Sequence, residues 1–418
     1  MLTPERQHET LLRGVEEILP EGSLLERLKL AAREGRPLRV KQGFDPTAPD
    51  IHLGHTVGLR KLRQFQDLGH QVVLIVGDYT GMVGDPSGRS KTRPQLTEDE
   101  VDRNAVTYLE QFYKVLDSAP AAPRLPVEVH KNGEWFSRMR FMDVLRLAGR
   151  YTVSQLLERD DFAKRFAAGQ PIGVHELMYP LMQGHDSVEI RADVELGATE
   201  QKFNLIVGRE LQRLAGQAPQ VVLTLPVLPG LDGMQRMSKS LGNYIGVTDA
   251  PGEMFGKVMS LPDTAMPLYW RLVTDVDDAG LEAVLLELAD PAVNPMTVKK
   301  RLGERLVTMY HGAAAAAPAR ADFETQFSRR EIPEHLAEFD REAVLAARGH
   351  VETAGIIEML MASGMADTKS AARRLVQQGA VSLDGAKIAA VDQGVDLDAE
   401  HVLRAGRKMM RYVPSRGV

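Results

Sequence analysis

The pattern of apolar and polar positions predicts that the chain starts as an alternation of strands and helices. Residues 38–42 alternate as a strand does, and residues 71–76 form a continuous apolar run, typical of a buried strand in a parallel sheet. Between these strands, residues 57–65 carry apolar side chains at helical spacing, after a glycine-bearing loop at residues 43–50. A strand, a loop with glycine and a helix in this order predict the first half of a βαβ unit.

The alternation continues to about residue 225, which predicts an open α/β sheet. Further strands are predicted at residues 127–130, 190–196 and 220–225. Two N-terminal helices, capped by Thr3 and Ser23, are predicted to precede the first strand. Later helices are predicted at residues 97–116, 141–166 and 174–183.

After residue 250 the apolar period becomes helical. Helices are predicted at residues 254–259, 280–288, 296–310 and 313–323. A third unit starts near residue 351, with two short helices at 356–363 and 369–378 and a hairpin at Asp384-Gly385. We therefore predict an α/β part at 1–232 with an insertion at about 120–170, a helical part at 233–330, a linker at 331–350 and a small α+β part at 351–418.

Composition narrows the class of protein. With 418 residues and 44% hydrophobic content, the chain is long enough for two or three domains with cores of their own. Its N-terminus is charged and its longest aliphatic run falls far short of the ~20 residues of a membrane span, so we predict a cytoplasmic protein without a membrane anchor. The absence of cysteine excludes disulfides and thiolate metal ligands. A net charge of -6 argues against a general nucleic-acid coat but leaves room for local clusters of cations.

The stretch His52-Leu53-Gly54-His55 stands where the first loop turns into a helix. Backbone N–H groups and the helix dipole at such a place favour phosphate, and both histidines can donate to it from one face of the first turn. Gly54 between them would let a flat ring lie on the backbone. A metal site or a solvated helix start are the alternatives; no further cluster of His, Asp or Glu has ligand spacing, so we predict no metal site.

A second stretch, Arg236-Met237-Ser238-Lys239-Ser240, follows a glycine-containing segment. It predicts a mobile loop with two cations and two hydroxyls that can close over phosphates. Asp85 is placed at a carboxyl end of the sheet, where ligands of open α/β folds bind, although a turn-forming aspartate is the simpler interpretation.

Three polar residues share one face of the predicted helix near residue 180. Tyr179, Gln183 and Asp186 are spaced by four and three residues, which could line a pocket for an aromatic side chain or form a solvated stripe. Gln201 lies near the carboxyl end of another predicted strand.

Together these stretches resemble the two signatures of the class I aminoacyl-tRNA synthetases, in the same order. The segments at 81–88 and 179–186 narrow the resemblance to the tyrosyl-tRNA synthetases of bacteria, and it extends from about Val40 to the C-terminus. It implies a Rossmann-like, doubly wound catalytic domain whose insertion carries a homodimer interface, a helical anticodon-region domain and a small RNA-binding domain. The implied activity joins L-tyrosine to ATP, giving tyrosyl-adenylate and pyrophosphate, and then transfers tyrosyl to the 3'-terminal adenosine of tRNA(Tyr).

The resemblance also implies roles for individual residues. Phosphate contacts would come from Thr47, His52, His55, Arg236 and Lys239, and adenylate contacts from Gly43, Asp45, Gly54 and Lys239. Asp85, Tyr179 and Gln183 would lie near the tyrosine amino group, Asp186 at the phenol, and Gln201 at the amino-acid or adenylate end. Mg2+ would enter with ATP as substrate, without a tightly bound cofactor.

The small C-terminal unit carries the cations expected to contact tRNA. As a bare charge pattern they would fit a solvated surface equally well. They are Lys369, Arg373, Arg374, Arg404, Arg407, Lys408 and Arg411.

The sequence departs from the usual pattern of the family at several positions. Lys41 stands where many members carry a tyrosine that touches the phenol, which leaves the partner of Asp186 unidentified. Arg236 replaces a lysine, and Ala198 and Glu200 replace glycine and aspartate near the ribose. A tryptophanyl-tRNA synthetase, a small-molecule nucleotidyltransferase and a non-catalytic RNA-binding factor with this fold are the alternative functions.

Overall fold

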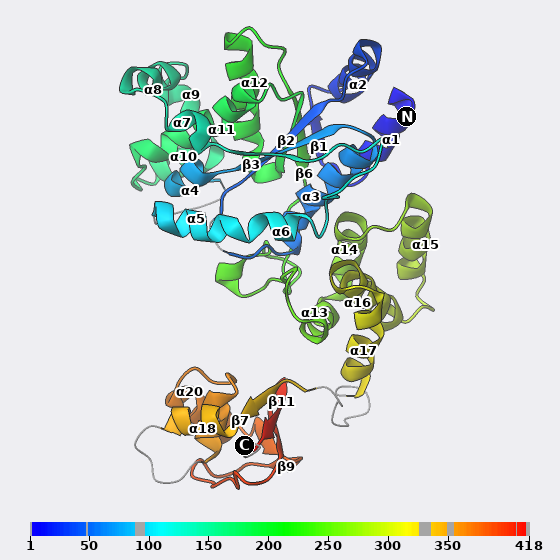
Figure 1. The fold of residues 1–418 in the computed structure, drawn as a ribbon, viewed down its shortest axis with the longest axis vertical. Coiled ribbons are helices and arrows are strands. Elements are labelled where there is room, and N and C mark those ends of the chain that lie inside the picture. Colours follow the sequence, from blue (N-terminus) through cyan, green and yellow to red (C-terminus); the bar gives the residue numbers. More distant parts are fainter. Residues whose placement is uncertain are drawn as a thin grey trace. The chain divides into compact units, whose positions relative to one another are not determined.

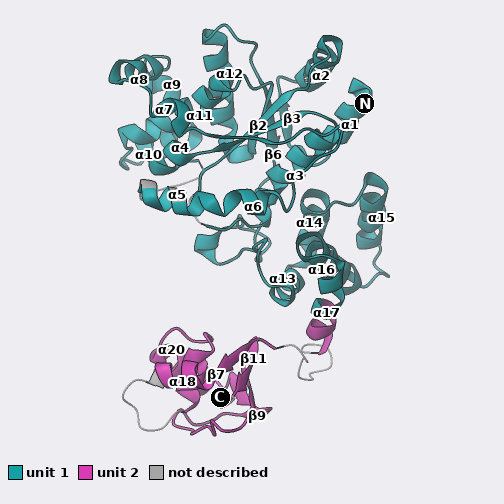
Figure 2. Cartoon of the chain, viewed as in Figure 1, with its two compact units in different colours: residues 1–319 teal, residues 320–418 magenta. Residues whose placement is uncertain are grey.

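The computed structural model describes residues 2–46, 49–87, 97–325, 336–348, 355–406 and 408–414. These residues form two compact units, 1–319 and 320–418 (Figures 1 and 2). Thr47 and Arg407, both predicted site residues, lie outside the described residues. Within the described ranges, no helix has the length and apolar content required to cross a membrane.

A six-stranded sheet forms the centre of the first unit. Its order is β1 (Glu17–Leu19), β6 (Val221–Leu225), β5 (Val194–Ala198), β2 (Arg39–Phe44), β3 (Gln71–Val76) and β4 (Glu128–Lys131). All neighbours pair in parallel except β1, which pairs antiparallel with β6. The parallel α/β sheet predicted from the sequence is confirmed, but β1 was missed because three residues are too few to show a period.

Helices cover both faces of this sheet (Figure 1). Helix α3 (Leu53–Asp67) follows β2 as predicted, and it buries Leu59, Leu62 and Phe65. The other helices of the α/β part are α1 (Pro4–Leu12), α2 (Ser23–Glu34), α4 (Asp78–Val83), α5 (Glu98–Val106), α6 (Tyr108–Phe112), α7 (Gly133–Phe136), α8 (Phe141–Ala148), α9 (Val153–Leu156), α10 (Asp160–Ala167), α11 (Val174–Glu189) and α12 (Lys202–Leu214). The observed arrangement is therefore the doubly wound fold.

Of the two caps predicted from the sequence for the N-terminal helices, the one at Thr3 is present and the one at Ser23 is not. Thr3 accepts the N–H of Arg6, and Thr97 forms a capping box with Glu100. The predicted cap at Ser23 is wrong: the N-cap is Gly22 at φ 75°, and the Ser23 hydroxyl donates to the carbonyl of Pro20 instead. Both predicted helices, α1 and α2, precede β2, and the short strand β1, which was not predicted, lies between them.

Further helices of the first unit are α13 (Pro251–Met259), α14 (Met266–Val273), α15 (Asp278–Ala289), α16 (Pro295–His311) and the start of α17 (Ala313–Phe323), whose last residues belong to the second unit. Helix α14 was not predicted; it buries Met266, Tyr269, Trp270, Leu272 and Val273 and so lacks the polar stripe that marks an amphipathic helix. It packs on α3, which carries the histidine motif at its start.

The second unit is a small α+β domain. Its elements are β7 (Glu338–Asp340), α18 (Arg341–Arg348), α19 (Ile356–Ala362), α20 (Lys369–Gln377), β8 (Val381–Leu383), β9 (Ala386–Lys387), β10 (His401–Ala405) and β11 (Lys408–Val413). The predicted hairpin is present, with Asp384 and Gly385 at φ 50° and 82° between β8 and β9. Strand β7 pairs with β11, so residues 338–348 belong to this domain and not to a linker.

Candidate active site

A cavity of about 490 Å³ lies at the carboxyl ends of the parallel strands. It brings together segments that are far apart in the sequence: the ends of β2, β5 and β6, the start of α3, and the loop at 236–240. The predicted site residues that line it are Gly43, Asp45, His52, Gly54, His55, Asp85, Tyr179, Gln201, Arg236 and Lys239.

The two histidines cap α3 with their Nδ1 atoms. His52 Nδ1 accepts the N–H of Gly54 at 3.2 Å, and His55 Nδ1 accepts the N–H of His52 at 3.2 Å. The pKa of His52 is lowered to about 2 and that of His55 to about 4, chiefly by burial, and the charge of Lys239 contributes to both shifts. Both rings are therefore neutral, with the proton on Nε2, and can donate without carrying charge.

Gly54 makes room for the histidine beside it. A Cβ added at Gly54 would lie 2.9 Å from Cε1 of His52 and 3.6 Å from Cβ of Met237. The His52 imidazole thus occupies the space that a side chain at position 54 would need. Glycine is required here by the fold of the motif itself.

Backbone contacts hold the histidine motif against the segment that follows the cationic loop. The N–H of Leu53 donates to the carbonyl of Ile245 at 2.9 Å, and His52 forms a β-bridge with Gly246. Within the loop, the Ser238 N–H donates to Asn243 Oδ1 at 2.8 Å. The two signatures are therefore joined structurally as well as by sequence order.

Both cations of the loop are paired with carboxylates. Arg236 Nη1 lies 2.9 Å from Glu200 Oε2, and Lys239 Nζ lies 3.6 Å from Asp50 Oδ2. Partial burial lowers the pKa of Lys239, while Asp50 opposes this shift. Each pair is part-exposed, so an incoming phosphate can compete for the cation.

Asp45 and Tyr179 meet on the floor of the cavity. The Tyr179 hydroxyl donates to Asp45 Oδ2 at 2.8 Å, and Thr80 Oγ1 donates to Asp45 Oδ1 at 2.7 Å. Burial and the charge of Asp45 raise the pKa of Tyr179 well above its usual value. Tyr179 is consequently a neutral hydroxyl group throughout the physiological range.

Asp85 both forms a turn and lines the cavity. Its Oδ1 accepts the N–H and hydroxyl of Ser87 at 2.9 and 2.6 Å, and its Oδ2 accepts Gln201 Nε2 at 3.3 Å. The two interpretations offered by the sequence are therefore compatible at this residue.

Asp186 is buried below the cavity and does not line it. Its carboxylate accepts Trp135 Nε1 at 2.9 Å and Asn132 Nδ2 at 3.4 Å. Burial raises its pKa to about 7, which the charge of Lys41 and these hydrogen bonds oppose. Trp135 and Asn132 were missed by the sequence analysis, although Asn132 directly follows a strand, the same signal that pointed to Asp85.

Lys41 is engaged away from Asp186. Its Nζ donates to the Gln183 carbonyl and to Ser187 Oγ, both at 2.8 Å, and lies 3.0 Å from Glu195 Oε1. The side chains of Lys41 and Glu195 are fully buried. Gln183, which was predicted to reach tyrosine, also lies outside the cavity lining.

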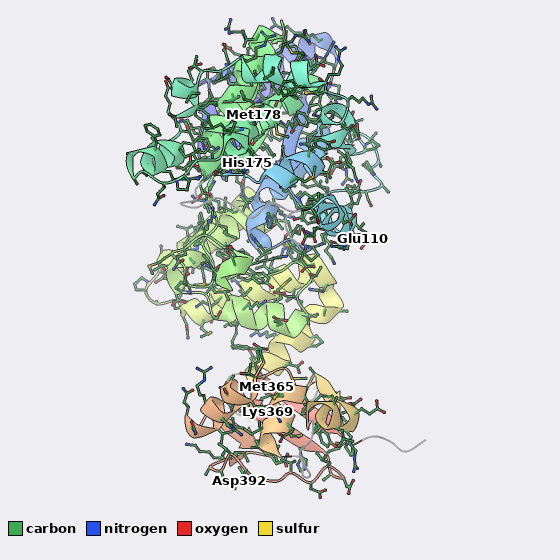
Figure 3. The ribbon with its side chains drawn as sticks, turned by 90° about the vertical axis from the view of Figure 1, so that its left-hand side faces the viewer. Glu110, His175, Met178, Met365, Lys369 and Asp392 are labelled. Atoms are coloured by element: carbon green, nitrogen blue, oxygen red, sulfur yellow. The ribbon has the colours of Figure 1, made fainter. Side chains whose placement is uncertain are left out.

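The cations of the small domain divide between two sides of its core. Lys369, Arg373 and Arg374 belong to α20, whose Ala372 and Val376 pack against the face of the sheet that carries Leu403 and Tyr412. Arg404 and Arg411 alternate with these buried residues on β10 and β11 and therefore point to the other face. Lys369 starts α20 at the surface (Figure 3), and Lys408 starts β11.

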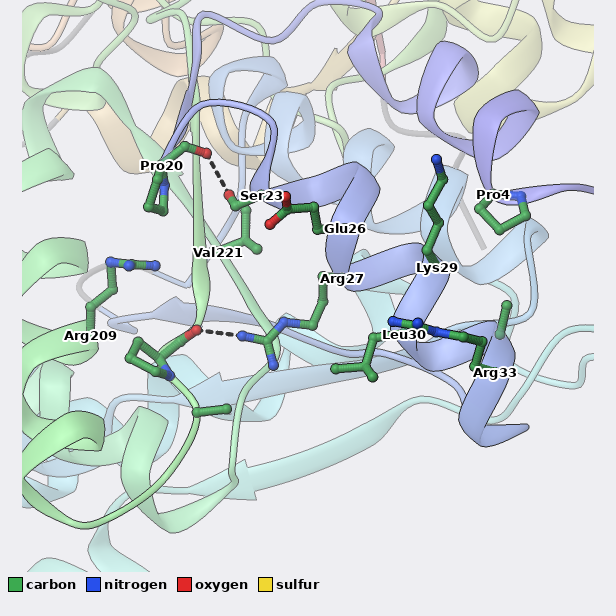
Figure 4. A pocket seen from close by; sticks show the side chains of 13 residues that line it. Pro4, Pro20, Ser23, Glu26, Arg27, Lys29, Leu30, Arg33, Arg209 and Val221 are labelled. Carbon is green, nitrogen blue, oxygen red and sulfur yellow. Dashed lines mark hydrogen bonds between the residues drawn. The ribbon is translucent and has the colours of Figure 1, made fainter.

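A larger cavity of about 900 Å³ lies elsewhere in the first unit, between α2 and the start of β6 (Figure 4). Three of its cations have partners: Arg27 donates to the Pro219 carbonyl at 2.6 Å, Lys29 pairs with Glu5 at 3.1 Å, and Arg209 donates to the Gln220 carbonyl. None of the residues that line it is a predicted site residue, so we place the active site in the smaller cavity.

Comparisons with known proteins show the family of the chain. A family model described as tRNA synthetases class I (W and Y) matches residues 33–328. A tyrosine--tRNA ligase of Moorella thermoacetica is 49% identical over 96% of this chain and 94% of the relative, and one of Thermotoga maritima is 47% identical over 97% of each.

Solved structures share the fold. A tyrosyl-tRNA synthetase of Archaeoglobus fulgidus complexed with L-tyrosine has a TM-score of 0.61 at 23% identity, covering 76% of this chain and all (100%) of that one. A truncated mitochondrial tyrosyl-tRNA synthetase of Aspergillus nidulans has a TM-score of 0.63 at 19% identity, covering 78% and 95%. With the family match over most of its length and relatives nearly half identical from end to end, the chain belongs to the W and Y family of class I tRNA synthetases.

Proposed function

We propose that this protein is a tyrosine--tRNA ligase. It activates L-tyrosine with ATP to tyrosyl-adenylate and pyrophosphate, and then transfers tyrosyl to the 3'-terminal adenosine of tRNA(Tyr). The observation that carries the proposal is the single cavity in which the neutral donors His52 and His55 and the cations Arg236 and Lys239 surround one space beside Asp85 and Tyr179.

Activation is the attack of the tyrosine carboxylate on the α-phosphate of ATP. Negative charge grows on the departing pyrophosphate, so donors and cations around it lower the barrier, and no covalent protein intermediate is needed. His52 and His55 supply Nε2–H donors, and Arg236 and Lys239 exchange their carboxylate partners for phosphate oxygens. Thr47 belongs to this set by family resemblance. Mg2+ arrives bound to the nucleotide.

Adenylate binding falls to the opposite part of the cavity. Gly43 and Gly54 both line the cavity, and Asp45 is fixed by Tyr179 and Thr80. Ala198 and Glu200 also line this space. Glu200 is paired with Arg236, so we propose that nucleotide binding frees Glu200 for the ribose hydroxyls as Arg236 moves to phosphate.

Tyrosine is recognised at both ends. Asp85, Tyr179 and Gln183 receive its ammonium group, with Gln201 fixing Asp85. Asp186 accepts the phenol, oriented by Trp135 and Asn132. Phenylalanine would leave this buried acceptor without its ligand partner, which disfavours its binding.

The protein acts as a homodimer on its tRNA in this proposal. Helix α8 exposes large apolar side chains that a second copy would cover, with Phe141 at 75% and Met142 at 54% exposure. The cations of the small domain contact tRNA(Tyr) phosphates. We place the protein in the cytoplasm, where ATP and tRNA are available.

The test is amino-acid-dependent exchange of labelled pyrophosphate into ATP, without tRNA. Tyrosine, phenylalanine and tryptophan are compared in parallel. Exchange with tyrosine alone supports the proposal. Exchange with tryptophan would favour the tryptophanyl enzyme, and no exchange with any of the three would favour a non-catalytic RNA-binding role.

A further inference from the structure

A continuous chain of buried hydrogen bonds runs beneath the amino-acid end of the cavity. It begins at Glu195, whose Oε1 accepts Gln183 Nε2 at 3.0 Å. Gln183 Oε1 in turn accepts Asn204 Nδ2 at 2.9 Å, and Asn204 Oδ1 accepts Arg159 Nη1 at 3.0 Å. All four side chains are buried.

The chain of hydrogen bonds continues from Arg159 to Asp85, another residue of the proposed ammonium site. Arg159 Nη2 donates to Ser87 Oγ at 2.8 Å, and Ser87 Oγ donates to Asp85 Oδ1 at 2.6 Å. Arg159 is held in turn by Asp161, at 2.7 Å from Nε, and by the ring of Phe162, at 4.9 Å from its guanidinium carbon. The Arg159 guanidinium therefore donates both to Ser87, which holds Asp85, and to Asn204, which holds Gln183.

The residues at the two ends, Arg159 and Glu195, fix how the amide groups between them are oriented. An arginine can only donate, so Asn204 must turn its oxygen to Arg159 and its nitrogen to Gln183. An ionised carboxylate can only accept, so Gln183 must turn its nitrogen to Glu195. Both constraints agree, and they leave the Gln183 amide in one orientation, with a second lone pair on Oε1 still available.

Lys41 allows the carboxylate end to stay charged in a dry environment. Its Nζ lies 3.0 Å from Glu195 Oε1 and also donates to the Gln183 carbonyl. Ser187 Oγ and Gln220 Nε2 donate to the other oxygen of Glu195. Pairing and hydrogen bonding together offset the cost of burying both charges.

We propose that Arg159 and Glu195 are positioning residues of the amino-acid pocket. Through the intervening side chains they fix the amide of Gln183 and the carboxylate of Asp85, two of the three groups that receive the tyrosine ammonium in the proposed function. A flipped Gln183 amide would turn an N–H group toward a cation. This inference rests on the proposed function and adds to it the residues that set the polarity of the ammonium site.

The test separates the ammonium from the rest of the ligand. Dissociation constants are measured calorimetrically for L-tyrosine, for tyramine, which keeps the ammonium but lacks the carboxylate, and for 3-(4-hydroxyphenyl)propanoate, which lacks the ammonium. The main variant is Asn204→Leu, which removes the central donor and acceptor at nearly constant size. Gln66→Leu is the matched control, because Gln66 is an equally buried amide whose partners lie at Asp117 and Leu125.

Asn204→Leu is expected to raise the dissociation constants of tyrosine and tyramine by about tenfold or more, as the loss of a hydrogen bond to a charged group predicts. The dissociation constant of the propanoate should change by less than about twofold, which is within the range seen for surface substitutions. Ser87→Ala, a milder change that cuts the link from Arg159 to Asp85, should show the same selectivity if Asn204→Leu does not fold. Gln66→Leu should leave the ratios among the three ligands unchanged.

Equal weakening of all three ligands, or no weakening in a folded variant, would overturn the positioning role while tyrosine binding by the wild type still stands. Failure of the wild type to bind tyrosine or tyramine would instead refute the proposed function on which the inference rests.

Discussion

The indole Nε1 of Trp135 donates a 2.9 Å hydrogen bond to the buried carboxylate of Asp186. The donor comes from the helix after β4 and the acceptor from the last turn of α11, so the contact exists only in the folded chain. It supplies the partner of Asp186 that the presence of Lys41 had left open.

Loss of this donor should alter ionisation at the phenol end. In Trp135→Phe the Asp186 carboxylate loses a hydrogen bond that favours its charged form, so its pKa should rise further. We expect weaker tyrosine binding at neutral pH with the optimum displaced to higher pH, measured by calorimetric titration. Trp270→Phe, a change at the other tryptophan, should leave both unchanged.

Tyrosine affinity should depend on pH through Asp186. Its folded-state pKa is about 7, above the unfolded value, so the carboxyl is increasingly protonated below neutral pH and a weaker acceptor for the phenol. The dissociation constant of tyrosine should therefore fall as pH rises through about 7. The variant Asp186→Asn should bind tyrosine without this dependence, and persistence of the same midpoint in that variant would assign it to another group.

The same carboxyl should affect stability with the opposite sign. Between the ordinary aspartate pKa of 3.8 and about 7 the folded state holds a proton that the unfolded state has released. The free energy of unfolding therefore loses a contribution as pH rises across this range. Urea unfolding at several pH values gives the free energy of unfolding of wild type and Asp186→Asn. The two proteins should differ in how steeply this free energy changes with pH.

Lys239 should matter more for chemistry than for tyrosine binding. Its partner charge grows on pyrophosphate during activation, so Lys239→Ala should slow adenylate formation by about 10²–10³-fold. The dissociation constant of tyrosine should stay within about twofold, because Lys239 lies at the phosphate side of the cavity. Lys202→Ala, at a lysine paired with Glu17 on the surface, is the control; equal losses in rate and affinity would contradict the assignment.

The histidines should act as neutral donors. Because burial holds both pKa values at about 4 or below, the activation rate should show no histidine inflection between about pH 5.5 and 7.5, where a free imidazole titrates. His55→Gln, which can keep an N–H donor, should retain more activity than His55→Ala. A clear inflection near pH 6.5 that disappears in His55→Gln would show a charged ring instead.

The exposed face of α8 should hold the dimer together. Phe141→Glu places a charge where the proposal requires an apolar contact, and we expect monomers by sedimentation velocity. Leu286→Glu, at a similarly exposed leucine on α15, should leave the assembly unchanged. A dimer that survives Phe141→Glu would place the interface elsewhere.

The sequence was sufficient to predict elements with a clear period or cap and to predict the two signature motifs. Residues 71–76 were predicted as a buried strand and form β3, and the Asp384-Gly385 hairpin is where its turn chemistry placed it. Periodicity failed for α14, which is buried on most sides, and for β1, whose three residues are held by pairing with β6.

Contacts between distant polar residues were beyond sequence reasoning. Nothing in a single sequence shows that Lys41 pairs with Glu195, or that Trp135 reaches Asp186, because burial and partner choice are set by packing. Gln183 shows the same limit: its spacing places it on one helix face with Tyr179, but it does not reveal that its amide bonds to Glu195 and Asn204.

The two imidazoles at the start of α3 have one nitrogen for the backbone and another for the ligand. Selection for folding and selection for turnover therefore act on the same imidazole ring, so neither histidine can be replaced freely. A second-site suppressor elsewhere in the chain could restore the thermal stability of a His52 or His55 variant. It could not restore the Nε2–H donor. Revertants selected for growth should therefore regain histidine itself far more often than revertants selected only for a soluble protein.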